Sequence, residues 1–470
     1  MSAEFHLGRD RGGARRDAGT PLRMLLLSDC LGDTESPAAL GQRTIHRIDL
    51  DRFDSVLARL KPGLDLGEHG TLDFRTLDDF HPDSLCRRSP VLGGLLETRR
   101  ALEDPAQVER LLAADHGEKD AGTPSESTAV SDLERLLGGK VGAASDAGET
   151  QFTRYLASLV APHLVDTRAA EPYRQATEQS LAEQLAALLH DSRFQTLEAS
   201  WRGLWWLVTQ LQAEEIELYL LPLGRAELLD DLQAAGTGLA ASGTFNQLFG
   251  SDQSARWSVI VGLYDFDATH ADIGALAALT AIAAGGQAAL LAGAAPGMAG
   301  ADSARSLAEP GRWQDHDPEI RDRWQALQRS QAAQRVALAA PRLLLRAPYD
   351  PREEPIESFG FNEGVTRRSE LLWGTGALGL CAGLGQLFLG DEWDMDPTTA
   401  VQLEDLASFS FHQDGEAVLQ PPTETVLSDQ AVEALARAGL TPLMGSRNRI
   451  EVVLPGCVSI AGTVLRGPWG

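Results

Sequence analysis

The stretch from His190 to Val208, HDSRFQTLEASWRGLWWLV, constrains the fold more than any other part of the chain. Apolar side chains recur in it at steps of three and four residues, the spacing of one face of an α-helix. These side chains are Phe194, Leu197, Trp201, Leu204, Trp205 and Val208. Asp191 or Ser192 stands where an N-cap residue belongs. Three tryptophans within six residues carry too much apolar area to remain in water, so this helix is predicted to be a core or interface element.

Composition excludes several classes of protein. A chain of 470 residues with 43% hydrophobic and 23% charged residues is typical of a globular protein of two or three domains. The net charge of −26 argues against nucleic-acid binding, because affinity for phosphates depends on clusters of Lys and Arg. The four cysteines lie far apart, which favours reduced thiols in a cytoplasmic protein. We find no apolar signal region and no run near the ~18 apolar residues of a membrane span, so no membrane insertion is expected.

Residues 1–112 are predicted to form a small α/β domain. The run at 22–29 is a strand candidate, and Asp51 precedes a helix whose apolar face begins at Phe53. A short strand is also predicted at 3–8, where Phe5 and Leu7 alternate with polar residues.

Residues 113–150 are rich in Gly, Ala, Ser and acidic residues, which indicates a flexible linker. A short amphipathic island interrupts it, with helical spacing of Leu133, Leu136 and Leu137. Residues 151–455 are predicted to form a larger α/β domain, followed by a short tail at 456–470. The pattern of a strand at 257–266, a helix at 271–284 and a strand at 287–294 predicts a parallel βαβ unit in that domain.

No motif in the chain is specific for catalysis. Gly374, Gly376 and Gly379 spell G-x-G-x-x-G, but the preceding RRSELLW is not convincingly the buried strand that a dinucleotide site requires. A helix of small residues that packs closely is therefore favoured, and an α/β nucleotide-binding enzyme is the distant alternative. The ten histidines form no metal-binding pattern, and there is no G-x-S-x-G or P-loop. We expect no metal, no cofactor and no enzymatic activity.

Several sequence segments resemble those of a known family and occur in the same order along the chain. PLRMLLLSD, RIDLDRFDSVLARLKPGLDL and LDFRTLDDFHPDSL resemble the small contractile-sheath subunit of type VI secretion systems, the TssB/VipA family, over about 3–112. The tryptophan-rich stretch, GLYDF, RWQALQRS, LAAPRLLLRAPY and PPTETVLSDQAVEALARAGLTPLM resemble the large sheath subunit, the TssC/VipB family, over about 131–455. The chain therefore resembles a fusion of the two subunits.

This resemblance implies a contractile tail-sheath-like α/β fold and a non-enzymatic, structural role in the bacterial cytoplasm. The implied partners are other sheath subunits, an inner tube protein, a ClpV-type AAA+ unfoldase and the baseplate. Packing or interface residues would be Phe53, Phe194, Leu197, Trp201, Leu204 and Trp205. Phe5 and Leu7 would belong to a strand shared between subunits, and Leu133, Leu136 and Leu137 to a handle for the unfoldase.

The resemblance weakens near the end of the sequence. The segment MGSRNRIEVVLPG differs from the family's sequence pattern. The C-terminal arm of the large subunit is not recognisable. In the family, terminal strands of neighbouring subunits interleave, which is strand addition to an exposed sheet edge. An alternative is therefore a sheath-like cap, nucleator or regulatory accessory that does not polymerise.

Overall fold

The computed structural model describes most of the chain, and all structural statements refer to this part. The described residues are 19–34, 38–103, 152, 155–156, 159–160, 170–236, 238–249, 257–413, 416–447 and 449–469. The predicted strand with Phe5 and Leu7 and the island with Leu133, Leu136 and Leu137 lie outside them. The chain divides into two compact units, and each draws on separate stretches of sequence. The first contains 1–62, 196–347 and 367–470, and the second contains 63–195 and 348–366.

The first unit is built on a seven-stranded sheet with the order β14-β8-β7-β6-β1-β5-β2. Neighbouring strands are parallel, except that β2 is antiparallel to β5. The strands are β1 (Leu22–Ser28), β2 (His46–Ile48), β5 (Ile216–Pro222), β6 (Val259–Phe266), β7 (Ala289–Ala294), β8 (Val336–Ala340) and β14 (Thr441–Pro442). The chain is therefore mixed α/β with a mainly parallel sheet, as expected.

β1 lies inside this sheet, between β5 and β6. Leu22 pairs with Ile216 on one side, and Met24 pairs with Val259 on the other. Every β1 residue except Arg23 is buried, which explains why its sequence is a continuous apolar run rather than an alternating one. The predicted arrangement of a separate small domain beside a larger one is not confirmed, because this N-terminal strand completes the sheet of the C-terminal region.

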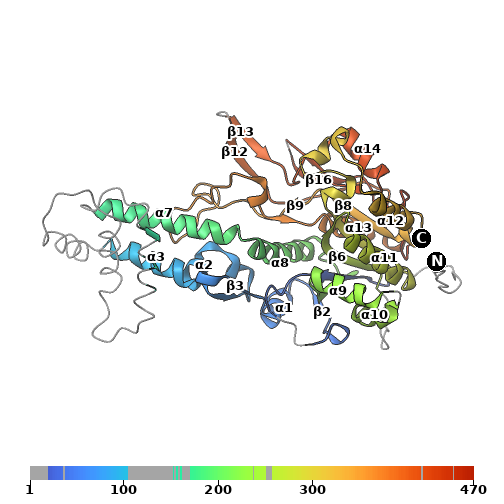
Figure 1. The fold of residues 1–470 in the computed structure, drawn as a ribbon, viewed down its shortest axis with the longest axis horizontal. Coiled ribbons are helices and arrows are strands. Elements are labelled where there is room, and N and C mark those ends of the chain that lie inside the picture. The colour runs from blue at the N-terminus through green and yellow to red at the C-terminus, as the bar shows by residue number, and fades with distance from the viewer. Residues whose placement is uncertain are drawn as a thin grey trace. The chain divides into compact units, whose positions relative to one another are not determined.

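Helices cover both faces of the sheet (Figure 1). Leu25 and Leu27 of β1 belong to a core cluster with α9 (Arg225–Ala235), α11 (His270–Gly285), α12 (Pro318–Gln328) and α14 (Asp429–Arg437). Met24 points to the opposite face, where its sulfur lies 3.5 Å from Cys381 Sγ of α13 (Ala377–Asp391). Side chains of a strand alternate between faces, so β1 contributes to both layers of the core.

Several elements agree with their predictions. The tryptophan-rich helix is α8 (Ser192–Gln210), and Asp191 Oδ1 caps it by accepting from the N–H groups of Arg193 (2.9 Å) and Phe194 (3.2 Å). The Phe53 helix is α1 (Phe53–Leu60). β6, α11 and β7 form the predicted parallel βαβ unit. The first unit also contains α10 (Gly243–Phe249), β9 (Leu343–Leu344), β10 (Trp373–Gly374), β11 (Val401–Leu403), β12 (Phe409–Gln413), β13 (Glu416–Gln420), β15 (Met444–Ser446) and β16 (Arg449–Leu454).

The second unit is mainly helical. It contains β3 (Gly63–Asp65), β4 (Thr71–Asp73), α2 (Pro82–Arg88), α3 (Pro90–Ala101) and α7 (Ala170–Leu189). α3 and α7 lie side by side (Figure 1), and Arg99 Nε of α3 donates to Glu178 Oε1 of α7 at 2.7 Å. Phe74 and Phe80 stack at 4.1 Å between ring centres, and Phe194 contacts the edges of this pair.

Asp83 fastens α2 to the segment 348–366 within this unit. Its carboxylate accepts hydrogen bonds from Ser358 Oγ (2.6 Å), the Ser358 N–H (2.8 Å) and the Glu357 N–H (3.0 Å). Burial alone would raise the pKa of Asp83, but these hydrogen bonds and nearby His81 lower it below its usual value of 3.8. A carboxylate whose pKa is lower in the folded state stabilises the fold above its unfolded pKa.

We predict that Asp83→Asn lowers the free energy of unfolding by about 1–3 kcal/mol at pH 7, because an amide cannot accept all three bonds. The wild-type advantage should shrink as the pH falls from about 4 through the lowered pKa. Urea titrations at pH 7, 4 and 3 measure both effects. Ser358→Ala serves as the partner variant in a double-mutant cycle. Additive losses would contradict the assigned contact.

Candidate functional site

The predicted packing residues of α8 divide into a buried set and one exposed member. Phe194, Leu197, Trp201 and Leu204 are at most 1% exposed, so the structure places them in the core. Trp205 is 37% exposed and is one of the few large apolar side chains at the surface of the described residues. Whether any of these residues contacts another subunit stays a prediction, and Trp205 is the member whose position permits it.

Phe53 joins α1 to the tryptophan face of α8. It is fully buried, and its ring makes edge contacts with Trp201 at 5.8 Å and with Trp205 at 5.0 Å between ring centres. Trp201 Nε1 donates to the carbonyl of Cys30 at 3.0 Å, so the indole is satisfied in the core. The partly exposed Trp205 ring therefore packs against Phe53, a side chain that is itself fully buried.

Two buried residues of α8 lie outside the predicted apolar face. Trp206 is 8% exposed, and its Nε1 donates to the carbonyl of Asp405 at 3.1 Å. Trp206 falls outside the spacing of three and four residues that defines the apolar face, and the apolar area of the three tryptophans is the signal that predicts its burial. Glu198 lies in the second turn of α8, where a charged side chain usually faces solvent, but it is fully buried.

Glu198 lies between two arginines. Its Oε1 accepts from Arg202 Nε at 2.7 Å and from Arg346 Nε at 2.9 Å. Arg346 is 9% exposed and follows β9, so the buried carboxylate links α8 to this segment. Glu198 Oε2 has no hydrogen-bond partner among the described residues. The i,i+4 spacing of Glu198 and Arg202 indicates their contact, but no local pattern indicates Arg346, which lies 148 residues away.

The three glycines of the G-x-G-x-x-G motif pack against the chain itself. A Cβ at Gly376 would lie 2.4 Å from the carbonyl oxygen of Ala339, and one at Gly379 would lie 2.9 Å from Leu443. β10, which ends at the first glycine of the motif, pairs with β9 outside the parallel sheet. The motif thus lets α13 approach its neighbours, as the helix-packing interpretation predicts.

At the turn before α13, the carboxylate of Asp265 lies where a nucleotide-binding site would need room for a phosphate. Thr375 Oγ1 donates to Asp265 Oδ1 at 2.6 Å, and burial raises the pKa of Asp265, opposed by Arg342 and by this hydrogen bond. A Cβ at Gly293 would clash with both side-chain oxygens, at 1.9 and 2.0 Å. This arrangement opposes the nucleotide-binding alternative, because an anion would meet an acidic side chain at the helix entry.

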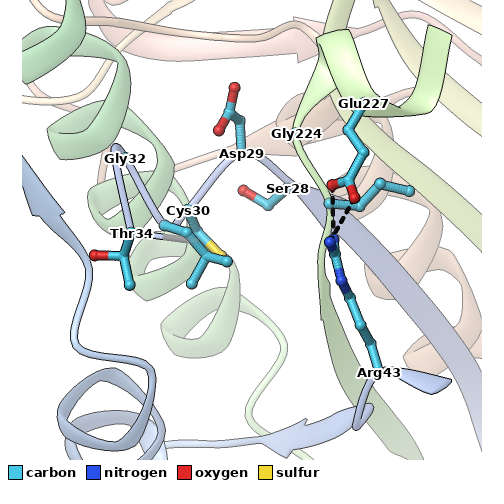
Figure 2. Close-up of a pocket in the computed structure, with 10 residues that line it drawn as sticks. Ser28, Asp29, Cys30, Gly32, Thr34, Arg43, Gly224 and Glu227 are labelled. Atoms are coloured by element: carbon cyan, nitrogen blue, oxygen red, sulfur yellow. Dashed lines mark hydrogen bonds and ion pairs between the residues drawn. The ribbon is translucent and has the colours of Figure 1, made fainter. Parts of the chain in front are cut away.

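A cavity of about 340 Å³ lies at the carboxyl ends of β1 and β5 (Figure 2). This is where open α/β sheets commonly bind ligands. Arg43 and Glu227 close one side as an ion pair, with Arg43 Nη1 2.7 Å from Glu227 Oε2, and Arg43 also donates to the carbonyl of Pro222 at 2.9 Å. The cavity is lined by Ser28, Asp29, Cys30, Leu31, Gly32, Thr34, Arg43, Leu223, Gly224 and Glu227.

The electrostatics of this cavity do not favour nucleophilic chemistry. Burial raises the pKa of the Cys30 thiol, and Asp29 raises it further, so the reactive thiolate is disfavoured. Burial also raises the pKa of Asp29, opposed by the Arg225 N–H and reinforced by Glu227. The Arg43–Glu227 pair instead fastens the segment before β2 to α9.

Within the described residues, no three His, Cys, Asp or Glu side chains are placed to hold a metal ion. The helices of the same part of the chain include none with the length and apolar character needed to cross a membrane.

Comparison with known proteins identifies two regions. The family model described as "EvpB/VC_A0108, tail sheath N-terminal domain" matches residues 174–461, and "Type VI secretion system, VipA, VC_A0107 or Hcp2" matches residues 5–109. The type VI secretion system sheath protein TssC1 of Pseudomonas aeruginosa is 27% identical over 287 residues, which cover 58% of this chain and 57% of TssC1. TssB1 of the same organism, also a sheath protein, is 28% identical over 134 residues, 22% of this chain and 78% of TssB1.

The chain therefore spans just over half the length of TssC1. The predicted resemblance to both sheath subunits is confirmed, since each region has its own family model and its own curated relative. The chain belongs to the EvpB/VC_A0108 tail sheath family and carries a VipA-type region in the same polypeptide.

Proposed function

We propose that this chain is a fused structural subunit of a type VI contractile sheath, which acts in the cytoplasm and not as an enzyme. The observation that carries the proposal is the position of β1. This strand belongs to the VipA-matching region, and its neighbours β5 and β6 belong to the tail-sheath-matching region. The two regions share one sheet, as expected of a building block that supplies both sheath components at once.

In this role the chain would assemble with other sheath subunits around an inner tube. Contraction would come from a shift between packed subunits rather than from chemistry at a pocket. The inner tube, the baseplate and a ClpV-type unfoldase are proposed partners. Leu133, Leu136 and Leu137 remain the proposed handle for the unfoldase. The residues 3–8 remain the proposed strand shared between subunits.

Electron microscopy of negatively stained samples tests this function. The chain is expressed alone and together with separate small and large sheath subunits, and particles are labelled through an affinity tag. Tubes from the chain alone, or its incorporation along co-expressed sheaths, would support a sheath subunit. Label confined to sheath ends would replace this proposal with a cap or nucleator. Absence of the chain from all sheaths would reject both.

Trp205 provides a residue-level prediction. We expect Trp205→Ala to reduce incorporation into sheaths about tenfold or more, because exposed aromatic anchors dominate interface energies. The stability of the isolated chain should fall by only about 1 kcal/mol, since the ring is partly exposed and its main aromatic contact is with Phe53. Pull-down of tagged variants with co-expressed sheath subunits measures incorporation.

Leu389→Ala is the matched control, because Leu389 on α13 is similarly exposed at 42%. Equal incorporation of the two variants would remove Trp205 from the interface. A large loss of stability for Trp205→Ala would assign it to the core instead.

A further inference from the structure

A groove lies between the segment after α13 and the C-terminal residues, and we call it the tail groove. Its volume is about 460 Å³. Its lining is Gln334, Met395, Asp396, Pro397, Thr463, Val464, Leu465, Arg466 and Trp469. Met395 and Leu465 are buried in its floor, whereas Val464 is 46% exposed. The lining thus combines five apolar residues with polar ones and with one charged residue of each sign, Asp396 and Arg466.

Hydrogen bonds of the backbone hold the walls of the tail groove in place. The Cys457 N–H donates to the carbonyl of Pro397 at 2.7 Å, and the Arg466 N–H donates to the carbonyl of Gln334 at 2.7 Å. Trp469 Nε1 donates to the carbonyl of Leu465 at 3.4 Å, and its ring covers Gly467 so closely that a Cβ there would lie 2.3 Å away. The C-terminal residues therefore form a fixed wall, and the groove exists before anything binds.

The described part of the N-terminal region begins beside this groove. The Gly19 N–H donates to Glu392 Oε2 at 3.4 Å, and Trp393 Nε1 donates to the carbonyl of Thr20 at 3.0 Å. Trp393 precedes the groove residue Met395 by two positions. Residues 1–18 are thus tethered to the chain within a few residues of the groove.

Charge and pattern of residues 1–18 complement this surface. Asp391, Glu392, Asp394 and Asp396 are exposed, and residues 9–17 carry four arginines, Arg9, Arg11, Arg15 and Arg16, against the two aspartates Asp10 and Asp17. Beyond these arginines, Phe5 and Leu7 alternate with polar residues. Along the sequence the arginines therefore stand between Gly19 and the apolar pair, so they are the side chains that would come nearest to the acidic residues.

We propose that residues 3–8 bind in the tail groove of their own chain before assembly, with Phe5 and Leu7 as the apolar contacts. This inference rests on the proposed function. The twelve-residue tether from Leu7 to Gly19 reaches about 40 Å when extended and about 19 Å on average when flexible. Such a short tether gives an effective concentration in the millimolar range, so weak contacts suffice. In this state the segment is withheld from neighbouring subunits until a sheath competes for it.

Cross-linking of the full chain alone tests this proposal. Leu7→Cys is combined with Val464→Cys, and disulfide formation by copper–phenanthroline is followed by non-reducing gels and mass spectrometry of the linked peptides. The four native thiols are buried, and burial raises their pKa values, so the introduced pair reacts selectively. The control pairs Leu7→Cys with Ile450→Cys, because Ile450 is 53% exposed but does not line the groove.

We expect the Val464 pair to form an intrachain disulfide at least about tenfold faster than the Ile450 pair. Its rate should be independent of protein concentration and several-fold slower in 1 M salt, which screens the charge contacts. Equal rates for the two pairs, or links that form only between chains, would overturn the proposal.

The outcome is separable from that of the proposed function. The linked chain should stay out of co-expressed sheaths until it is reduced. Failure to link, with normal incorporation of the unmodified chain, would reject docking alone. Efficient linking of a chain that never incorporates, even after reduction, would reject the sheath role.

Discussion

Glu198→Gln should lower the free energy of unfolding by about 3–5 kcal/mol, the usual cost of removing one member of a buried ion pair. The substitution preserves the side-chain volume but removes the charge between Arg202 and Arg346. Arg346, at 9% exposed, would then remain in the core without this carboxylate. Urea titration followed by tryptophan fluorescence measures the change, because Trp201 and Trp206 lie on the same helix.

Glu319→Gln is the matched control. Glu319 also pairs with an arginine four residues later, Arg323, at 2.8 Å, but both side chains are more than half exposed. An exposed i,i+4 pair contributes about 0.3–0.5 kcal/mol. Similar losses for the two variants would show that Glu198 is not a structural charge of the core.

Trp201→Ala should cost a comparable amount, about 3–5 kcal/mol, as other large-to-small changes of buried aromatic residues do. The variant leaves a cavity beside Phe53 and removes the hydrogen bond to the carbonyl of Cys30. Because this carbonyl follows β1, the loss loosens the contact between α8 and the end of β1. The unfolding midpoint in urea measures the effect.

Trp201→Phe separates the two contributions. It keeps an aromatic ring beside Phe53 but has no N–H donor, so we expect an intermediate loss of about 1–3 kcal/mol. A phenylalanine variant as unstable as the alanine variant would show that a smaller aromatic ring beside Phe53 restores no stability once the indole N–H is lost. A stable alanine variant would contradict the core position of Trp201.

Much of the local structure could be predicted from the sequence. β1, β6 and β7 are apolar runs of strand length bounded by turns, and the spacing of α8 allows no other element. The order of strands could not be predicted in the same way. β1 pairs with residues about two hundred positions away, and no local pattern encodes which strands become its neighbours. For this reason the sequence could not show that strands of both regions belong to one sheet.

The candidate site was predictable to a lesser degree. Helical periodicity identified the buried face around Trp201, but it cannot distinguish a core face from an interface. Periodicity also does not predict the burial of Glu198, because a glutamate near the start of a helix usually faces solvent. Its burial is explained by the contact with Arg346, which lies far away in the sequence. The family resemblance rests on several sequence segments that occur in the same order as in the family. The matching family models confirm it. The strand at 3–8 and the handle at 133–137 stay predictions.

The position of β1 inside the sheet has a consequence for synthesis. A ribosome makes β1 early, but β6, one of its two partners, emerges only after roughly ten to fifty seconds at the usual rate of translation. Until then this very apolar strand has an open edge, which is a template for aggregation. The nascent chain thus depends on protection by chaperones or on rapid burial against early helices. Joining the two regions in one polypeptide guarantees that the missing strands always arrive, and always in equal number.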